Sequence, residues 1–273
     1  MTFIIILIAL IIERFFDWGH IRQWGWFIRY QQWLGTRLSG LSAYVLLVIS
    51  VLPPILIVGV TNHLLSGWLY SILKLFFGVA VLVYCLGPNN FWAQIYSCIG
   101  MLRNEEPTTA MARVQTICGV SLPNDSQAFH HAFTKCIFVE ANRRIFAVFF
   151  WFIVLGPVGA VLYRTIDLCR RGLTTMQVAM QMQRLLDWLP LRVFAFIFAL
   201  GGHFTGVMQC YRRDFFTSPK ANDKLLTDCG VAAVDVLEAT RIPEDGSAEQ
   251  ETLALLDRVF IMALAILAVI VLL

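Results

Sequence analysis

The longest uncharged stretch of the chain constrains its fold more than any other feature. Between Arg37 and Lys74 lie 36 residues without a charged side chain. One membrane crossing needs roughly 20 predominantly apolar residues. The stretch therefore predicts two crossings, at about 41–60 and 67–87, with a break near Thr61-Asn62-His63.

Two adjacent prolines lie inside the first of these predicted spans. Pro53 and Pro54 supply no backbone N–H, and a proline ring clashes with the preceding helical turn, so we expect a kink there. In a bilayer, the carbonyls that lose their donors need other partners. We therefore expect neighbouring helices or water to satisfy them.

Four further apolar stretches bring the number of candidate membrane segments to six. They run from Phe3 to Ile12, from Ile145 to Tyr163, from Val193 to Tyr211, and from Val259 to Leu273, the last with a possible start near Leu253. Only 14% of the residues are charged, against about 25% in a typical soluble domain. We predict an all-α, polytopic helical membrane protein with four to six membrane-embedded helices plus amphipathic cytoplasmic helices. We expect the lipid bilayer to surround a single integral membrane domain, residues 1–273.

The distribution of Lys and Arg predicts which loops face the cytoplasm. Eighteen of the 21 lie in four segments, which are 13–40, 87–144, 164–188 and 209–252. With six full crossings, the four basic residues of 164–188 fall on the opposite side from the other fourteen. If 145–163 and 193–211 instead enter the membrane and return, or pack inside a protein bundle, all eighteen share one side. Both arrangements keep 87–144 and 209–252 as cytoplasmic helical segments.

Several functional classes are disfavoured by the sequence. The net charge is only +3 and the basic residues are scattered, which argues against a nucleic-acid partner. The seven cysteines show no metal-ligand spacing, so we expect buried apolar cysteines, with neither a zinc site nor a disulfide framework. Phosphate-loop, dinucleotide, zinc-protease and serine-hydrolase motifs do not occur. We therefore expect no metal, no cofactor and no catalytic residue.

Three groups of acidic and arginine residues border the apolar stretches between 140 and 192. Arginine can bind phosphate through two parallel hydrogen bonds. A charged side chain at membrane depth is costly, and such residues are usually paired or functional. The groups could therefore converge on a small anionic or phosphorylated ligand. Alternatively, they are ion pairs and anchors that set the depth of the helices. The candidates for ligand binding are Glu140, Arg143, Tyr163, Arg164, Asp167, Asp187 and Arg192.

Spacing makes two of these groups candidates for ion pairs on one helix face. Glu140 precedes Arg143 and Arg144 by three and four residues, and Asp167 precedes Arg170 and Arg171 in the same way. The stretch 174–188, which follows the second group, has the 3.6-residue periodicity of a surface or interfacial helix. Its predicted polar stripe contains Gln177, Gln181 and Arg184.

A histidine lies inside the uncharged stretch 193–211. His203, in Gly201-Gly202-His203-Phe204, could carry a proton or contact a ligand at membrane depth. The alternative is a structural histidine that is hydrogen-bonded to a neighbouring helix.

Three strings of the chain together resemble one known family. They are Glu13-Arg14-Phe15-Phe16, the run from Phe149 to Gly159 that continues to Tyr163-Arg164, and Leu186-Asp187-Trp188-Leu189-Pro190-Leu191-Arg192 continuing to Gly201-Gly202-His203. Their order resembles the AmpE family, which is related to the CobD/CbiB cobinamide synthases. The likeness is best over about 140–205.

The resemblance implies a multi-pass protein of the bacterial inner membrane. It implies a role in β-lactamase induction and cell-wall signalling, with a functional link to a cytoplasmic muropeptide amidase. The synthase branch implies an alternative, an ATP-dependent amide-forming ligase that couples an aminopropanol phosphate to an adenosylated corrinoid acid.

The chain departs from the synthase pattern next to its YR pair. Synthases tend to follow YR with N-T-L-D-S, whereas this chain continues Thr165-Ile166-Asp167-Leu168-Cys169 and lacks the asparagine. The E-x-N string is kept as Glu140-Ala141-Asn142, and the resemblance therefore adds Asn142 to the ligand-binding candidates. This partial retention predicts a relative that keeps the scaffold and part of a pocket and has lost the reaction.

Overall fold

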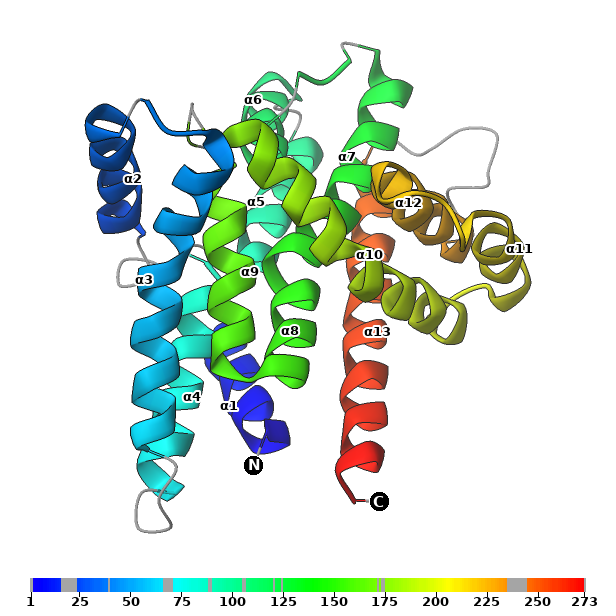
Figure 1. Ribbon diagram of the computed structural model, residues 1–273. Coiled ribbons are helices and arrows are strands. Elements are labelled where there is room, and N and C mark those ends of the chain that lie inside the picture. Colours follow the sequence, from blue (N-terminus) through cyan, green and yellow to red (C-terminus); the bar gives the residue numbers. More distant parts are fainter. Residues whose placement is uncertain are drawn as a thin grey trace. The chain divides into compact units, whose positions relative to one another are not determined.

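The computed structural model of the chain consists of helices and short connections, with no strand among the residues that it describes (Figure 1). The described residues are 2–15, 24–38, 40–65, 71–87, 90–104, 107–119, 121–123, 125–170, 172, 175–234 and 245–272. Over these residues the predicted all-α class is confirmed. Phe16 of the first family string and residues 235–244 of the segment 209–252 lie outside them.

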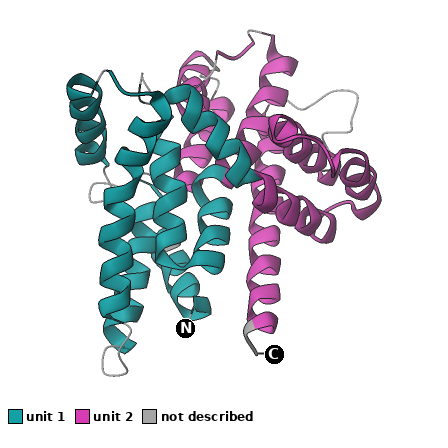
Figure 2. Cartoon of the chain, in the orientation of Figure 1, with its two compact units in different colours: residues 1–90, 143–187 teal, residues 91–142, 188–273 magenta. Residues whose placement is uncertain are grey.

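The chain divides into two compact units, which Figure 2 distinguishes by colour. Unit 1 comprises Met1–Asn90 and Arg143–Asp187, and unit 2 comprises Phe91–Asn142 and Trp188–Leu273. Each unit is assembled from two separate pieces of the chain, so neither is contiguous in sequence. The expectation of a single domain over 1–273 stays a prediction.

Unit 1 is built around helix α9. Its helices are α1 (Thr2–Phe15), α2 (Gly25–Arg37), α3 (Ala43–Leu64), α4 (Ser71–Cys85), α8 (Ala147–Leu155), α9 (Pro157–Cys169) and the first part of α10 (Met176–Gly201). Helix α9 packs against α3, α4 and α8, and α1 packs against α4. Large side chains such as Phe27, Leu82, Phe152 and Tyr163 are fully buried and form the core of this unit.

Unit 2 is built around helix α7. Its helices are α5 (Phe91–Arg103), α6 (Pro107–Cys118), α7 (Ser126–Ala141), the rest of α10, α11 (Phe204–Asp214), α12 (Asn222–Ala233) and α13 (Ser247–Leu272), with a 3₁₀ turn at Pro219–Ala221. Helix α7 packs against α6, α12 and α13. Phe133, Phe138 and Phe198 are fully buried in its core. The predicted helical character of 87–144 is confirmed for the residues described.

Two of the described helices, α3 and α13, are long and apolar enough to cross a membrane, and α1 and α4 are shorter apolar helices. Helices α3 and α4 match the two crossings predicted at 41–60 and 67–87. Their exposed side chains are apolar, with Val48, Ile57 and Phe76 each more than half exposed. Such a belt favours contact with lipid rather than with water.

The apolar stretch 145–163 is broken at its centre. Gly156 has φ 67° and ψ −154°, a backbone conformation essentially restricted to glycine. Pro157 then begins α9, which returns alongside α8 as an antiparallel hairpin (Figure 1). A Cβ on Gly159 would overlap the backbone oxygen of Trp151, so the close approach of the two helices also requires glycine there.

The stretch 193–211 is also broken, because α10 ends at Gly201 and α11 begins at Phe204. Neither stretch therefore forms one continuous crossing helix. From Ile145 to Leu155 the first arm of the hairpin is only about 16 Å long at 1.5 Å per residue, against a hydrocarbon core of about 30 Å. The structure thus favours an arrangement in which neither stretch crosses the membrane as a single helix.

Helix α3 continues through Pro53 and Pro54 because a side chain replaces a lost donor. The carbonyl of Ile49, four residues before Pro53, accepts a hydrogen bond from the Tyr30 hydroxyl at 3.1 Å. Helix α10 repeats the solution at Pro190, where the carbonyl of Leu186 accepts from Trp151 Nε1 at 3.2 Å. The expectation that neighbouring helices satisfy the carbonyls is confirmed at Ile49.

The Tyr30 bond predicts a coupled effect of two substitutions. Tyr30→Phe leaves the Ile49 carbonyl without this donor and should lower the free energy of unfolding by about 1–2 kcal/mol. In a Pro53→Ala background, the new backbone N–H can donate to Ile49, so the same change should cost much less. Thermal unfolding of the four proteins in detergent measures the coupling. Tyr44→Phe, which removes a 3.3 Å bond to Gln181, is the exposed control, and equal costs in both backgrounds would contradict this account.

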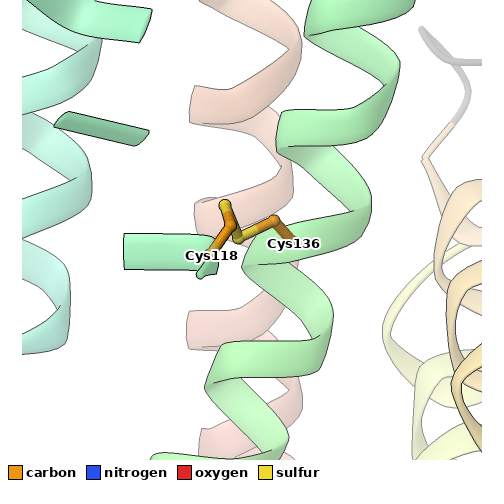
Figure 3. Close-up of a disulfide and its surroundings, with 2 residues drawn as sticks. All are labelled: Cys118 and Cys136. Carbon is orange, nitrogen blue, oxygen red and sulfur yellow. A yellow bond between two sulfur atoms is a disulfide. The ribbon is translucent and has the colours of Figure 1, made fainter. Parts of the chain in front are cut away.

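Cys118 and Cys136 form a disulfide between the end of α6 and α7 (Figure 3). The expectation of no disulfide is wrong for this pair, because no motif marks a separation of 18 residues and only the packing of α6 on α7 brings the two together. The other five cysteines are free thiols, four of them buried and Cys210 partly exposed, which agrees with the expected apolar role.

The disulfide predicts a redox response in the cell. Cytoplasmic thiols are kept reduced, and the segment 87–144 is predicted to face the cytoplasm. We therefore expect Cys118 and Cys136 to be reduced in growing cells and to pair after oxidant treatment. Acid quenching followed by labelling with a maleimide polymer, compared with Cys118→Ser, counts the free thiols. A fully formed bond in untreated cells would place α6 and α7 in an oxidising compartment and contradict the predicted orientation.

Candidate functional site

Helices α9 and α10 bring together four of the candidate residues in unit 1. Tyr163 and Asp167 lie one helical turn apart on α9, and Gln183 and Asp187 lie one turn apart on α10, so each pair shares a helix face. The Tyr163 hydroxyl donates to Asp187 Oδ1 at 2.7 Å. Tyr163, Asp167, Gln183 and Asp187 are all buried. We call these residues, with Arg164 and Arg170, the α9–α10 cluster.

Asp167 is the centre of the α9–α10 cluster. Its carboxylate accepts hydrogen bonds from Arg164 Nη1 at 3.0 Å and from Gln183 Nε2 at 3.3 Å, and Arg170 Nη1 lies 3.6 Å away. Arg170 Nη1 also donates to Gln183 Oε1 at 2.9 Å. The pairing of Asp167 with Arg170, predicted from their spacing, is therefore confirmed. Two arginines share this carboxylate, which neutralises it within the apolar interior.

Arg164 differs from the rest of the cluster because one nitrogen of its guanidinium has no hydrogen-bond partner among the described atoms. The side chain is 4% exposed, and its Nε has no hydrogen-bond partner among the described atoms although it is buried. The guanidinium lies over Gly87, where a Cβ would stand 2.8 Å from Nη2. Gly87 has φ 107°, a left-handed conformation that favours glycine. A glycine thus opens the space that Arg164 occupies.

The residues around Asn142 form a π-helical turn, Asn142–Phe146, between α7 and α8. π-helical turns are rare in proteins, and those that occur are often found at functional sites. The predicted pairing of Glu140 with Arg143 and Arg144 assumed α-helical spacing, which this turn interrupts. Asn142 is buried and Glu140 is half-buried, and both make interactions within the protein.

Arg192 makes four hydrogen bonds within unit 2. It donates from Nε to the Phe215 carbonyl at 2.7 Å and from Nη2 to the Thr217 carbonyl at 2.9 Å. Its Nη1 donates to the Trp188 carbonyl at 2.7 Å and to Asn222 at 3.4 Å, and the guanidinium stacks on the Trp188 ring at 3.9 Å. In this conformation Arg192 holds the connection between α11 and α12 against α10.

His203 caps a helix in the present structure. It precedes α11, and its Nδ1 accepts a hydrogen bond from the Gly206 backbone N–H at 3.2 Å. The side chain is exposed. This side-chain hydrogen bond lies within its own turn, whereas the His203 backbone N–H donates to the Ala233 carbonyl at the end of α12 at 3.3 Å.

The nine candidates thus divide between the two units. Unit 1 contains Arg143, Tyr163, Arg164, Asp167 and Asp187, and unit 2 contains Glu140, Asn142, Arg192 and His203. A single pocket that includes all nine stays a prediction. Sequence reasoning did not select Gln183 or Gly87. The spacing of four residues between Gln183 and Asp187 could have indicated that the two share a helix face. No pattern in the sequence marked Gly87.

Unit 2 contains a buried polar pair that the sequence did not reveal. His130 Nδ1 lies 2.8 Å from Glu249 Oε1, between α7 and the start of α13, and both side chains are almost fully buried. Across the described part of the chain, no group of three or more His, Cys, Asp and Glu side chains could hold a metal ion.

Comparison with known proteins places the chain in a family. A family model described as "Regulatory signalling modulator protein AmpE" matches residues 1–228, which include every candidate residue. The "Cobalamin biosynthesis protein CobD" of Stutzerimonas stutzeri (strain A1501) is 28% identical over 215 residues, 73% of this chain and 67% of that protein. The protein of the same name from Chromobacterium violaceum is 30% identical over 122 residues, 41% of this chain and 39% of that protein.

No solved structure matches this chain. The family match covers both pieces of unit 1 and the greater part of unit 2. The resemblance seen in the three sequence strings is therefore confirmed, and the chain belongs to the AmpE family of regulatory signalling modulator proteins.

Proposed function

We propose that this protein is a regulatory membrane protein in which the α9–α10 cluster binds a small anionic or phosphorylated ligand. The family match supports the regulatory role. The single observation that carries the ligand proposal is Arg164, a buried guanidinium with an unpaired Nε. Keeping a donor unpaired in an apolar interior is costly. An anion bound at Nε removes that cost.

The hydrogen bonds of the cluster favour binding over catalysis. Asp167 accepts bonds from Arg164 and Gln183 and lies beside Arg170, and Asp187 accepts from Tyr163. A general base needs a carboxylate that is able to take a proton from substrate. Both carboxylates instead already accept hydrogen bonds from side chains of the cluster, Asp167 from Arg164 and Gln183, and Asp187 from Tyr163. Such a network holds Arg164 in position and suits recognition.

The output we propose is regulation of β-lactamase induction in response to cell-wall fragments. The resemblance to the AmpE family implies this role and a functional link to a cytoplasmic muropeptide amidase. Cell-wall fragments and their precursors carry carboxylates or phosphates. Such a group can accept a hydrogen bond from the unpaired Nε of Arg164.

The second candidate function is a cobinamide-phosphate synthase of the CobD/CbiB type. Its support is the similarity to two proteins named for cobalamin biosynthesis. Rescue of a cobinamide-synthase-deficient strain tests it directly. Growth restored by this chain would replace the regulatory proposal with an enzymatic one.

We also propose an orientation in the bacterial inner membrane. Helices α1, α3, α4 and α13 cross it, while the α8–α9 hairpin enters from the cytoplasmic side and returns to it. The segments 13–40, 87–144, 164–188 and 209–252, with all eighteen of their basic residues, then lie on the cytoplasmic side. The α9–α10 cluster follows the hairpin and lies at the cytoplasmic membrane border.

This orientation predicts the labelling pattern of introduced cysteines. An impermeant maleimide should label Gln177→Cys, on the exposed face of α10, only from the cytoplasmic side, and should label His63→Cys, at the end of α3, only from the periplasm. Cys118→Ser, Cys136→Ser and Cys210→Ser remove the two thiols predicted to be reduced in the cell and the one partly exposed thiol among the described free cysteines. Burial raises the pKa of Cys229 to about 12, so this thiol stays unreactive, and Cys85, Cys98 and Cys169 are buried as well. Periplasmic labelling of Gln177→Cys would reject the arrangement.

The role of Arg164 predicts a loss of regulation. In a deletion strain, the wild-type gene should restore the β-lactamase induction ratio after β-lactam treatment. Arg164→Gln should restore less than about a tenth of the difference, because a charge-assisted contact is lost. Arg164→Lys keeps the charge without the Nε and should be intermediate.

Arg212→Gln is the matched control, since it removes an equal charge from an exposed position on α11. Protein amounts in the membrane fraction establish that each variant folds. Full induction with Arg164→Gln at normal protein amounts would contradict the proposed function.

A further inference from the structure

Unit 1 contains an apolar cavity of about 710 Å³ that is open along one side, because Ile57, Phe76 and Ala80 in its lining are exposed. Helices α1, α2, α3, α4 and α9 line it, with Ile8, Pro54, Ala80 and Val161 among the residues that face it. The cavity has the size of a site for a small organic molecule, typically about 300–1,000 Å³. Its walls are formed by the same helices that expose apolar side chains where lipid is expected.

Aromatic residues with polar groups form one part of this cavity. Trp24, Trp26 and Tyr84 all line it. Trp26 Nε1 donates to the Tyr84 hydroxyl at 2.8 Å, Trp24 Nε1 donates to the Tyr84 carbonyl at 3.2 Å, and the Trp24 and Tyr84 rings lie 4.6 Å apart. Tryptophan and tyrosine prefer the membrane–water interface, because one part of each is apolar and another is polar. These residues thus place this part of the cavity at headgroup depth.

Two chain segments lead from the cavity to Arg164. On α9, Val161 lines the cavity and Arg164 follows three residues later, on the same face. After α4, Tyr84 lines the cavity, and Gly87, on which the Arg164 guanidinium lies, again follows three residues later. Three residues of helix rise only about 4.5 Å. On α9, Arg164, which carries the buried and unpaired Nε, therefore follows the cavity-lining Val161 by about one helical turn, and its guanidinium lies over Gly87 just after the end of α4.

We propose that the cavity and Arg164 form one binding site for an anionic amphiphile from the membrane, a lipid with a phosphate head and a single apolar chain in the cavity. The head accepts from Arg164 Nε, and the chain replaces water along the walls. The inference rests on the proposed function and names its ligand class. Charge complementarity favours this occupant over a neutral lipid, because a neutral lipid leaves the buried guanidinium unpaired.

The test uses the full-length protein in a neutral detergent and native mass spectrometry. Hexadecyl phosphate is the probe, and hexadecanol and inorganic phosphate represent its tail and its head. We expect one saturable copy of hexadecyl phosphate, with weaker binding of the alcohol and of inorganic phosphate. A lipid phosphate that copurifies with the protein is the expected natural occupant.

Three variants separate the contributions of tail and head. Ala80→Phe places a ring in the cavity from an exposed position, and we expect it to weaken hexadecyl phosphate binding at least about tenfold. Arg164→Gln should weaken hexadecyl phosphate by about tenfold or more and leave hexadecanol unchanged. Val48→Phe adds an equal ring to an exposed position of α3 that does not line the cavity, and we expect no change.

The outcomes distinguish this inference from the function on which it rests. Equal binding to the wild type, Ala80→Phe and Arg164→Gln means non-specific partition and overturns the inference. Inorganic phosphate binding that depends on Arg164 but not on Ala80 also overturns it, while the proposed function stands. Conversely, hexadecyl phosphate binding that both variants weaken, together with normal induction by Arg164→Gln, overturns the proposed function and supports the site.

Discussion

The structure depends on one constraint, which is that every backbone carbonyl surrounded by apolar side chains needs a hydrogen-bond donor. At three interruptions of its helices, the chain meets the constraint with a specific residue. Tyr30 donates to Ile49 where Pro53 cannot, and Trp151 donates to Leu186 where Pro190 cannot. At Gly156 the chain reverses, and that N–H still donates to Phe152 at 2.9 Å. Interruptions that would otherwise be costly thereby become fixed features of the fold.

The reversal at Gly156 connects the fold to the candidate site. Because α9 returns along α8, its Tyr163, Arg164 and Asp167 lie toward the end of the hairpin at which the chain entered it, and α10 supplies Gln183 and Asp187 to pair with them. The resulting network leaves the Arg164 Nε unpaired beside Gly87. A family relationship to proteins named for cobalamin biosynthesis, together with a cluster whose carboxylates are already hydrogen-bonded, fits a scaffold that retains recognition without the reaction.

Much of this could be predicted from local pattern. Hydropathy and length predicted α3 and α4, and residue spacing predicted the pairing of Asp167 with Arg170. What depends on packing between distant segments could not be predicted. The disulfide of Cys118 needs α6 to lie on α7, and Gln183 was one of several glutamines until α9 defined which face of α10 is buried. The π-helical turn at Asn142–Phe146 altered a spacing that was assumed to be α-helical.

The central claim is that the α8–α9 hairpin turns back inside the hydrocarbon layer. Its most direct test is the depth of a nitroxide label at Val154, a half-exposed position next to the turn. The measurement compares the collision rates of the label with oxygen and with a water-soluble nickel complex in lipid bilayers. A turn within the hydrocarbon gives high oxygen and low nickel accessibility at Val154→Cys. Nickel accessibility as high as at His63→Cys, at the end of α3, would show that the hairpin reaches water on the far side and would contradict the account.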